Sequence, residues 1–220
     1  MNLVHTVYQP HSEGPHPTIL ALHGRGASAM DLLGLAPYIC GGRFLVICPQ
    51  GFLETPIGPG AMGYSWFPLS KGGPANVPAI LEARERVKTF LDASLARYPI
   101  DRGKLIALGF SQGGALAYSL ALGQPERFAA LVAISSRLTP ELVDHLPSAS
   151  SAQHLPTLIQ HGSRDELIAV DRAREALETL RSLRVPVTFR EYDIGHEISH
   201  QNIADLSAWL EEKVLSPIAV

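Results

Sequence analysis

The chain has 220 residues, of which 46% are hydrophobic and 18% charged, and this composition excludes a disordered or fibrous protein. Its 18 Lys and Arg against 21 Asp and Glu leave a formal net charge of −3, and the basic residues form no block. We therefore expect neither nucleic acid nor an anionic membrane as a partner. The length suits one domain, residues 1–220, whose apolar core needs no metal or disulfide.

Apolar runs typical of buried strands alternate along the chain with helical patterns. The strand candidates are residues 18–23, 44–49, 104–109, 129–135, 157–161 and the more alternating 187–192. Near-continuous apolar runs of this kind are typical of a parallel sheet covered on both faces. Apolar stripes at helical spacing predict helices over residues 78–98, 170–184 and 199–215. The alternation predicts an α/β domain with a mostly parallel central sheet, helices on both faces and right-handed crossovers.

Two stretches fit neither pattern and are long enough to be functional loops. Residues 51–74 are rich in Gly and Pro but carry Met62, Trp66 and Phe67, and residues 137–154 are mostly polar. The sequence leaves the conformation of both open. The apolar side chains of the first stretch fit the wall of a site, the contact of a homodimer, or a satellite cluster beneath a long loop.

The segment Gly109-Phe-Ser111-Gln-Gly113 follows a strand candidate and opens a run of small residues typical of a helix. This is the setting of a nucleophile elbow, a sharp turn that strains the serine backbone and raises its hydroxyl above the sheet. Glycines are needed on both sides because side chains there would collide across the turn. Ser111 is therefore the candidate nucleophile, and the alternative is a structural serine in a glycine-rich turn.

A serine nucleophile needs a base, which follows it in chain order when the serine lies in such an elbow. His196 lies between the last strand and the last helix, where a base can reach the carboxyl edge of the sheet. His161 ends a strand and is expected to be structural. The other histidines after Ser111 lie in the polar loop or at the start of the last helix: His145, His154 and His200. We predict His196 as the base.

The acid that orients this base is expected at the same edge of the sheet. Asp165 lies four residues beyond the strand candidate 157–161 and is our prediction. Asp193 competes because it lies three residues before the base, but its carboxylate would need a tight local turn. Glu166 and Asp171 are expected to face water, the latter near a helix start.

Developing negative charge on a substrate requires two backbone N–H groups. One is expected from Gln112, the residue after the nucleophile. The other is expected from Arg25, in a glycine-containing loop that follows the first strand candidate. The spacing of Ser28 and Asp31 resembles a capping box for a helix that would follow this loop. The role of the Arg25 side chain is left open.

Taken together, these motifs resemble the phospholipase/carboxylesterase family of α/β-hydrolases, to which acyl-protein thioesterases are similar. The resemblance covers about residues 16–212 and rests on His23-Gly-Arg-Gly, Pro49-Gln-Gly, Trp66, Gly109-Phe-Ser-Gln-Gly, His161-Gly-x-x-Asp165 and Gly195-His-Glu-Ile-Ser. It implies an α/β-hydrolase fold without a large cap domain and a Trp beside the catalytic serine. It also implies a nucleophile, an acid, a base and two oxyanion donors at Ser111, Asp165, His196, Arg25 and Gln112.

After the acid the chain departs from the family pattern. The family commonly has Pro, then Val-Pro, where this chain has Glu166, then Ile168-Ala169. The departure concerns the shape of the acyl pocket near Ile168 rather than the chemistry. We expect Met62, Trp66 and Phe67 to wall that pocket together with Ile168.

The resulting expectation is a serine carboxylesterase that hydrolyses small or short-to-medium-chain carboxylic esters through an acyl-enzyme, without a metal or cofactor. An acyl-protein thioesterase or lysophospholipase acting on longer chains is the alternative. A non-catalytic ligand-binding hydrolase fold would have lost a member of the triad, and a dienelactone-hydrolase-like enzyme would have Cys in place of Ser111.

The remaining features concern redox state and location. Cys40 and Cys48 are too few for a disulfide framework and lack the spacing of a zinc site, so we expect reduced thiols. The first residues lack the basic and apolar regions of a signal peptide, and no apolar run approaches the roughly 20 residues that span a bilayer. We therefore expect a cytoplasmic protein.

Overall fold

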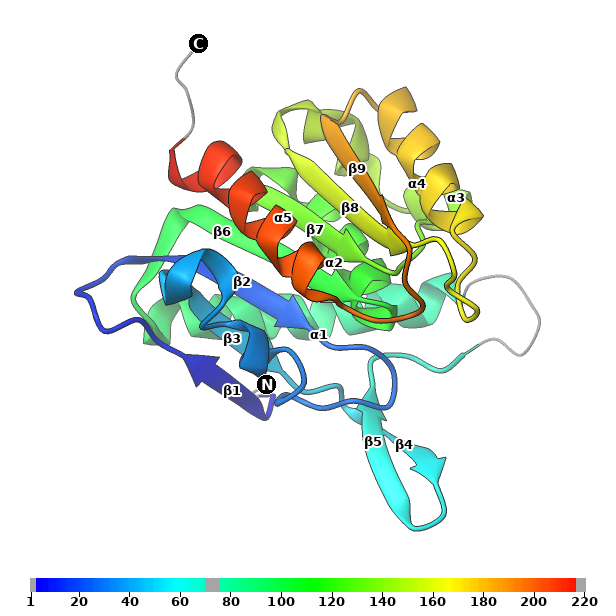
Figure 1. The fold of residues 1–220 in the computed structure, drawn as a ribbon, viewed down its shortest axis with the longest axis horizontal. Helices are drawn as coiled ribbons and strands as arrows, with labels where there is room; N and C mark the ends of the chain where they lie inside the picture. The colour runs from blue at the N-terminus through cyan, green and yellow to red at the C-terminus, as the bar shows by residue number, and fades with distance from the viewer. Residues whose placement is uncertain (1–2, 70–75, 217–220) are drawn as a thin grey trace.

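The computed structural model describes residues 3–69 and 76–216. Within them, seven strands form one sheet in the order β1-β3-β2-β6-β7-β8-β9 (Figure 1). Every neighbouring pair is parallel except β1 and β3, which are antiparallel. The bounds are β1 His5–Tyr8, β2 His16–Leu22, β3 Leu45–Pro49, β6 Ile100–Phe110, β7 Ala130–Ile134, β8 Thr157–Gly162 and β9 Val187–Tyr192.

Five α-helices lie in the described residues: α1 Val77–Arg97, α2 Gln112–Gly123, α3 Pro140–Val143, α4 Asp171–Ser182 and α5 His200–Leu210. Asn76 begins α1 by accepting a hydrogen bond from the Ala79 N–H (3.2 Å), and a capping box of Ser199 and Asn202 begins α5. Short helical turns complete the set: η1 Leu33–Leu35, η2 Ile39–Gly42, η3 Pro125–Arg127, η4 Pro147–His154 and the π-turn η5 Glu211–Leu215. No helix in these ranges combines the length and apolarity needed to cross a membrane.

The sheet is the middle of three layers. Successive residues of β2 alternate between two apolar cores, Leu20 and Leu22 facing α1, α2 and α4, and Ile19 and Ala21 facing α5 with η1 and η2. Both faces are therefore covered, which is why the strands are nearly continuous apolar runs. The predicted α/β architecture is confirmed, with α5 and α1 on opposite sides of the sheet in Figure 1.

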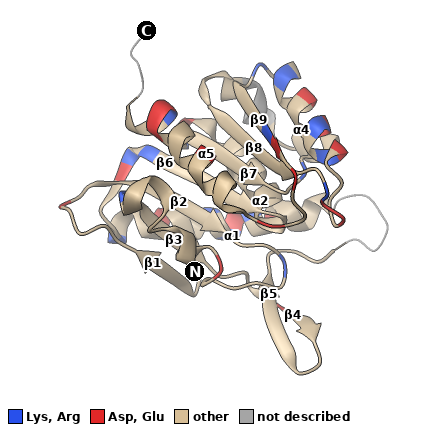
Figure 2. Ribbon diagram, viewed as in Figure 1, with Lys and Arg blue, Asp and Glu red and all other residues tan. Residues whose placement is uncertain are grey.

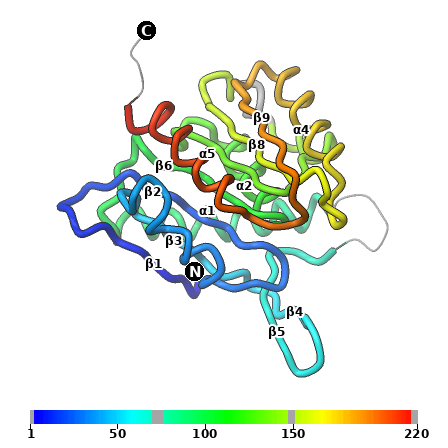
Figure 3. Tube along the Cα trace, in the orientation of Figure 1, coloured from blue at the N-terminus to red at the C-terminus, as the bar shows by residue number. Residues whose placement is uncertain are grey.

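Strand β1 and the hairpin of β4 (Leu53–Gly58) and β5 (Ala61–Ser65) have no counterpart among the predicted strands. All four residues of β1 are only half-buried, so no apolar run marks the strand. The hairpin occupies most of the described part of the stretch 51–74, and it projects from the body of the molecule in Figures 1 and 3.

The predicted capping box at Ser28 and Asp31 is wrong. The Ser28 side chain accepts a hydrogen bond from the Met30 N–H (3.2 Å), and its carbonyl accepts one from the Asp31 N–H (3.1 Å). These bonds close a turn, and the following η1 begins at Leu33 without a side-chain cap. Local spacing alone does not distinguish a helix start from such a turn, because the same side chains serve both.

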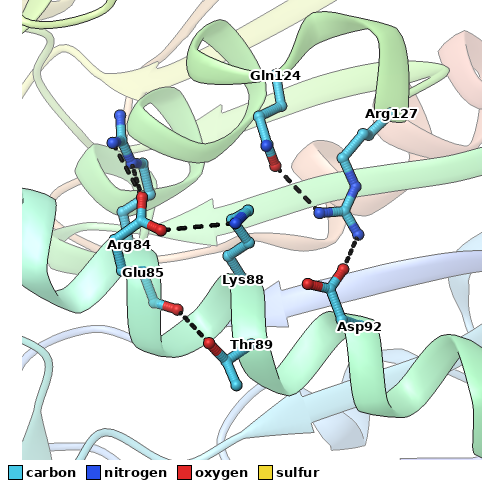
Figure 4. A network of polar contacts seen from close by, with 7 residues as sticks. All are labelled: Arg84, Glu85, Lys88, Thr89, Asp92, Gln124 and Arg127. Atoms are coloured by element: carbon cyan, nitrogen blue, oxygen red, sulfur yellow. Dashed lines mark hydrogen bonds and ion pairs between the residues drawn. The ribbon is translucent and has the colours of Figure 1, made fainter.

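Charged residues are frequent on helices such as α4, whereas strands β2, β3, β7 and β8 carry none (Figure 2). One polar network joins α1 to the segment that follows α2 (Figure 4). In it, Arg127 binds Asp92 of α1 (2.6 Å) and Gln124 (3.0 Å), while Glu85 lies between Arg84 and Lys88. Each exposed pair contributes at most about 1 kcal/mol, so burial of the helix faces is the larger source of stability.

Candidate active site

Ser111 lies at the junction of β6 and α2 with φ 53° and ψ −116°, a backbone conformation that residues other than glycine rarely adopt. The surrounding backbone holds it there. Its N–H donates to the carbonyl of Ile134 (2.9 Å), and its own carbonyl accepts from the Ser136 hydroxyl (2.8 Å). Because the end of β7 and the segment directly after it supply the two partners, the strained turn is fixed from the neighbouring strand.

The two glycines of the elbow are required by close backbone approach. A Cβ on Gly109 would overlap the carbonyl of Gly113, and a Cβ on Gly113 would overlap the carbonyl oxygen of Leu22. The predicted reason, collision across the turn, is confirmed for Gly109, whereas Gly113 is required by the close approach of β2. Larger residues would push α2 away from β2 and β6 and move the serine.

His196 lies in the loop after β9 and contacts Asp165, which lies in the loop after β8. The distance from His196 Nδ1 to Asp165 Oδ2 is 2.7 Å. The other carboxylate oxygen accepts the N–H groups of Leu167 (2.9 Å) and Ile168 (2.8 Å), and the side chain is fully buried. A carboxylate can only accept hydrogen bonds, so the single ring proton of a neutral His196 lies on Nδ1. The other ring nitrogen, Nε2, is then free to accept a proton. The ring of Phe110 packs on the imidazole, with centroids 4.9 Å apart.

The alternative acids do not contact the imidazole. Asp193 is 84% exposed and pairs with Arg164 (2.8 Å). Glu166 is exposed, and Asp171 pairs with Arg174 in the first turn of α4 (2.8 Å). The predicted contact between Asp165 and His196 is therefore confirmed as a hydrogen bond.

His161 is buried behind the acid rather than in the cavity. Its Nε2 donates to the carbonyl of Ile168 (2.8 Å) and lies 3.4 Å from Asp165 Oδ2. It thus secures the loop whose N–H groups hold the carboxylate. The other histidines after Ser111 are exposed and lie outside the cavity lining: His145, His154 and His200. His145 Nδ1 bonds to the carbonyl of Glu141 (2.8 Å), and His154 Nε2 bonds to the carbonyl of Pro125 (3.3 Å).

A cavity of about 440 Å³ opens over the elbow. Six residues predicted for the site line it: Arg25, Phe67, Ser111, Gln112, Ile168 and His196. Most of its remaining wall is apolar, from Pro68, Leu69, Ile80, Phe110, Ala115, Leu142 and Leu167, with Gly24, Asn76, Arg137 and Thr139 completing it. The sequence prediction missed residues 137–142, although they directly follow β7 and so lie at the same carboxyl edge.

Two predicted wall residues do not line this cavity. Met62 lies on the projecting hairpin and is 53% exposed, and the structure does not bring it to the cavity. Trp66 is completely buried, and its indole N–H donates to the carbonyl of His23 (2.9 Å). Its backbone N–H donates to the side chain of Gln112 (2.9 Å). Trp66 therefore supports the loop after β2 and the start of α2 rather than lining the cavity.

The backbone N–H groups of Arg25 and Gln112, two residues that line the cavity, have no hydrogen-bond acceptor within the described part of the chain. Gln112 is the first residue of α2, whose N-terminal end favours negative charge. Its side chain is fixed at both ends, since the amide nitrogen donates to the carbonyl of Phe67 (2.7 Å). This pair can stabilise an oxyanion beside Ser111.

His23, which sequence analysis did not assign a role, holds the loop that carries Arg25. Its Nδ1 donates to the carbonyl of Gly24 (2.7 Å), and its Nε2 accepts from the N–H of Gly51 (2.9 Å). The ring is buried against Trp66. Both hydrogen bonds require a neutral imidazole, because a protonated Nε2 would face the Gly51 N–H as a second donor.

Burial lowers the pKa of His23 below its ordinary value. As the pH falls through about 6.5, the unfolded chain therefore binds more protons at this residue than the folded chain does, and the free energy of unfolding should decrease as the pH is lowered. Urea unfolding of wild type and His23→Asn at about pH 5 and pH 7.5 tests this. The variant should be less stable at the higher pH, with a difference that shrinks at the lower one. An equal difference at both values would contradict the assignment.

The comparisons with known proteins now bear on this geometry. A model of the phospholipase/carboxylesterase family matches residues 4–214. The chain belongs to this family. The carboxylesterase SOBER1 of Arabidopsis thaliana is 27% identical over 163 residues, 70% of each chain. A probable carboxylesterase of Oryza sativa subsp. japonica, Os04g0669500, is 26% identical over 210 residues, 88% of this chain and 76% of the relative.

The crystal structure of esterase PE8 has the same fold, with a TM-score of 0.85 at 24% identity, covering 97% of this chain and 100% of that one. The predicted phospholipase/carboxylesterase resemblance and α/β-hydrolase fold are confirmed. The family match spans every element that carries a site residue, from the loop after β2 to the loop after β9.

Proposed function

We propose that this chain is a serine carboxylesterase in which Ser111 is the nucleophile, His196 the base and Asp165 the residue that orients the base. One observation carries the proposal: a strained serine and a histidine bonded to a buried carboxylate line the same cavity. The family match and the carboxylesterases among the relatives support the same reaction class.

The reaction uses the Ser111 hydroxyl, the Nε2 atom of His196 and two backbone N–H groups. Ser111 Oγ attacks the ester carbonyl while its proton passes to His196 Nε2, and the resulting oxyanion accepts from the N–H groups of Arg25 and Gln112. The imidazolium gives its proton to the departing alkoxide, which leaves an acyl-serine. Water then attacks the acyl carbonyl with His196 again as base, and the carboxylic acid and free serine are released.

The cavity favours short acyl chains. At about 440 Å³ it lies toward the small end of the range for ligand pockets, and Phe67, Ile80, Leu142 and Ile168 wall it. Each methylene that contacts such a wall contributes about 0.8 kcal/mol, or roughly a fourfold gain in kcat/KM. The gain ends where the wall ends, so acetate to hexanoate esters should be preferred to palmitate.

A series of 4-nitrophenyl esters from acetate to palmitate tests both reaction class and chain length. We expect kcat/KM to rise over the first few carbons and then level off. Ile168→Ala should lower the hexanoate-to-acetate ratio about fivefold, since it removes part of the wall. Met62→Ala, a control on the exposed hairpin, should leave the ratio unchanged.

A rate that climbs through palmitate would favour the alternative, a thioesterase or lysophospholipase acting on long chains. No turnover of any ester above background would overturn the proposal as a whole.

A further inference from the structure

Every lining residue of the cavity that carries a permanent charge is cationic. Arg25 and Arg137 line it, and no Asp or Glu is among the described residues of its wall. The chain as a whole has more acidic than basic residues, with a formal net charge of −3. The sign of the cavity is therefore opposite to that of the protein.

Neither guanidinium is neutralised by the protein. In residues 3–69 and 76–216, no hydrogen bond or ion pair involves the side chain of Arg25 or Arg137, and both residues are exposed. Arginines elsewhere on the surface pair with carboxylates, including Arg127, Arg164, Arg172, Arg174 and Arg181. The two arginines at the cavity thus keep their donors available to a ligand.

The carboxylates close to the cavity along the chain do not compensate this charge. Asp165 is buried and bound to His196 and two backbone N–H groups. Glu141, Glu166 and Glu197 are neighbours of lining residues but are exposed and do not line the cavity themselves. A positive potential therefore remains where substrate binds.

The two arginines flank the nucleophile. Arg25 belongs to the loop after β2 and Arg137 to the segment after β7, and these strands lie on either side of β6, which carries Ser111. Arg137 directly follows Ser136, whose hydroxyl binds the Ser111 carbonyl. An anionic group on either side of a bound ester would therefore lie near a guanidinium, whose planar donors suit a carboxylate.

We propose that the preferred substrates are esters carrying a carboxylate a few bonds from the scissile carbonyl, on the acyl or the alcohol side, which Arg25 and Arg137 attract from the two sides of the nucleophile. The inference rests on the proposed esterase function and specifies its substrate class. The apolar wall receives the methylenes between the two ends of such a molecule, and the arginines receive the charge.

Two matched pairs of esters test the inference. In the first, the carboxylate is on the acyl side: the 4-nitrophenyl half-ester of adipic acid against the same compound with its free carboxylate methylated. In the second it is on the alcohol side: 4-carboxyphenyl acetate against methyl 4-acetoxybenzoate. The measured quantity is the kcat/KM ratio of anionic to neutral ester, corrected for spontaneous hydrolysis.

We expect a ratio of about ten or more in at least one pair, the sum of two exposed charge pairs. Arg137→Gln should lower that ratio about threefold to fivefold, and added salt should lower it similarly by screening. Arg25→Gln, which keeps the backbone N–H, should lower the same ratio. The control is Arg102→Gln, an exposed arginine of β6 near the end of the strand remote from Ser111.

A ratio near one in both pairs, or an equal fall in Arg137→Gln and Arg102→Gln, would overturn the inference. In that event the neutral esters would still be hydrolysed. If neither member of either pair were turned over faster than with Ser111→Ala, the proposed function itself would fail, and the two failures are thereby distinguished.

Discussion

Ser111→Ala should lower kcat for 4-nitrophenyl butyrate by about 10⁴–10⁶ while leaving the fold intact. The substitution removes the oxygen that attacks the carbonyl. The backbone contacts of the elbow, to Ile134 and Ser136, involve only the N–H and carbonyl of residue 111, so alanine retains them. Alanine also tolerates φ 53° about as poorly as serine, and the turn gains no new strain. Steady-state kinetics and thermal unfolding measure the two effects.

Ser136→Ala is the matched control. It also removes a serine hydroxyl near the elbow, but this hydroxyl donates to the Ser111 carbonyl and is not the proposed nucleophile. Loss of one such hydrogen bond costs about 1 kcal/mol, so kcat should fall by no more than about tenfold. Retention of a tenth of wild-type kcat by a folded Ser111→Ala protein would refute the nucleophile assignment.

The sheet and the elbow could be predicted because each leaves a strong local pattern. Strands buried on both faces are mostly apolar, and β3 and β7 are apolar throughout while β2 has an apolar run over residues 19–22. The elbow needs glycines two residues before and after the serine for steric reasons that hold in any such turn. The contact of Asp165 with His196 followed from both lying beyond the carboxyl ends of adjacent parallel strands.

The wall of the cavity could not be predicted in the same way. Trp66 and Met62 both lie in a stretch rich in Gly and Pro, and the sequence does not show which of its apolar side chains turn inward. The pairing of β4 with β5 decides this, because it places Met62 opposite Pro56 on an exposed hairpin and ends at Ser65, directly before buried Trp66. The contact that buries Trp66 joins it to His23, 43 residues away in the chain, and such a contact leaves no local pattern in the sequence.

The edge of the sheet shows the same limit. Strand β1 pairs antiparallel with β3 over four residues and carries no fully buried side chain, so neither length nor hydrophobicity distinguishes it from a loop. Within the seven-stranded sheet, the strand that the sequence misses is therefore a short one at the edge.

Asp165→Asn should lower kcat by about 10⁴, because it reverses the hydrogen bond that sets the tautomer of His196. The amide oxygen would continue to accept from Leu167 and Ile168, which leaves the amide nitrogen facing the imidazole. His196 Nδ1 would then have to accept, its proton would move to Nε2, and Nε2 could no longer take the proton of Ser111.

The size of the effect separates this role from a structural one. Loss of one charge-assisted hydrogen bond costs about 1.5–3 kcal/mol of stability, whereas 10⁴ in rate corresponds to about 5.5 kcal/mol. Thermal unfolding therefore shows whether the variant is folded at the assay temperature while kcat reports the chemistry. Asp193→Asn is the matched control: its carboxylate is exposed and pairs with Arg164, so kcat should stay within about twofold of wild type. Comparable losses in the two variants would contradict the assignment of Asp165 as the acid, because Asp165 bonds to the imidazole (2.7 Å) whereas Asp193 pairs with Arg164.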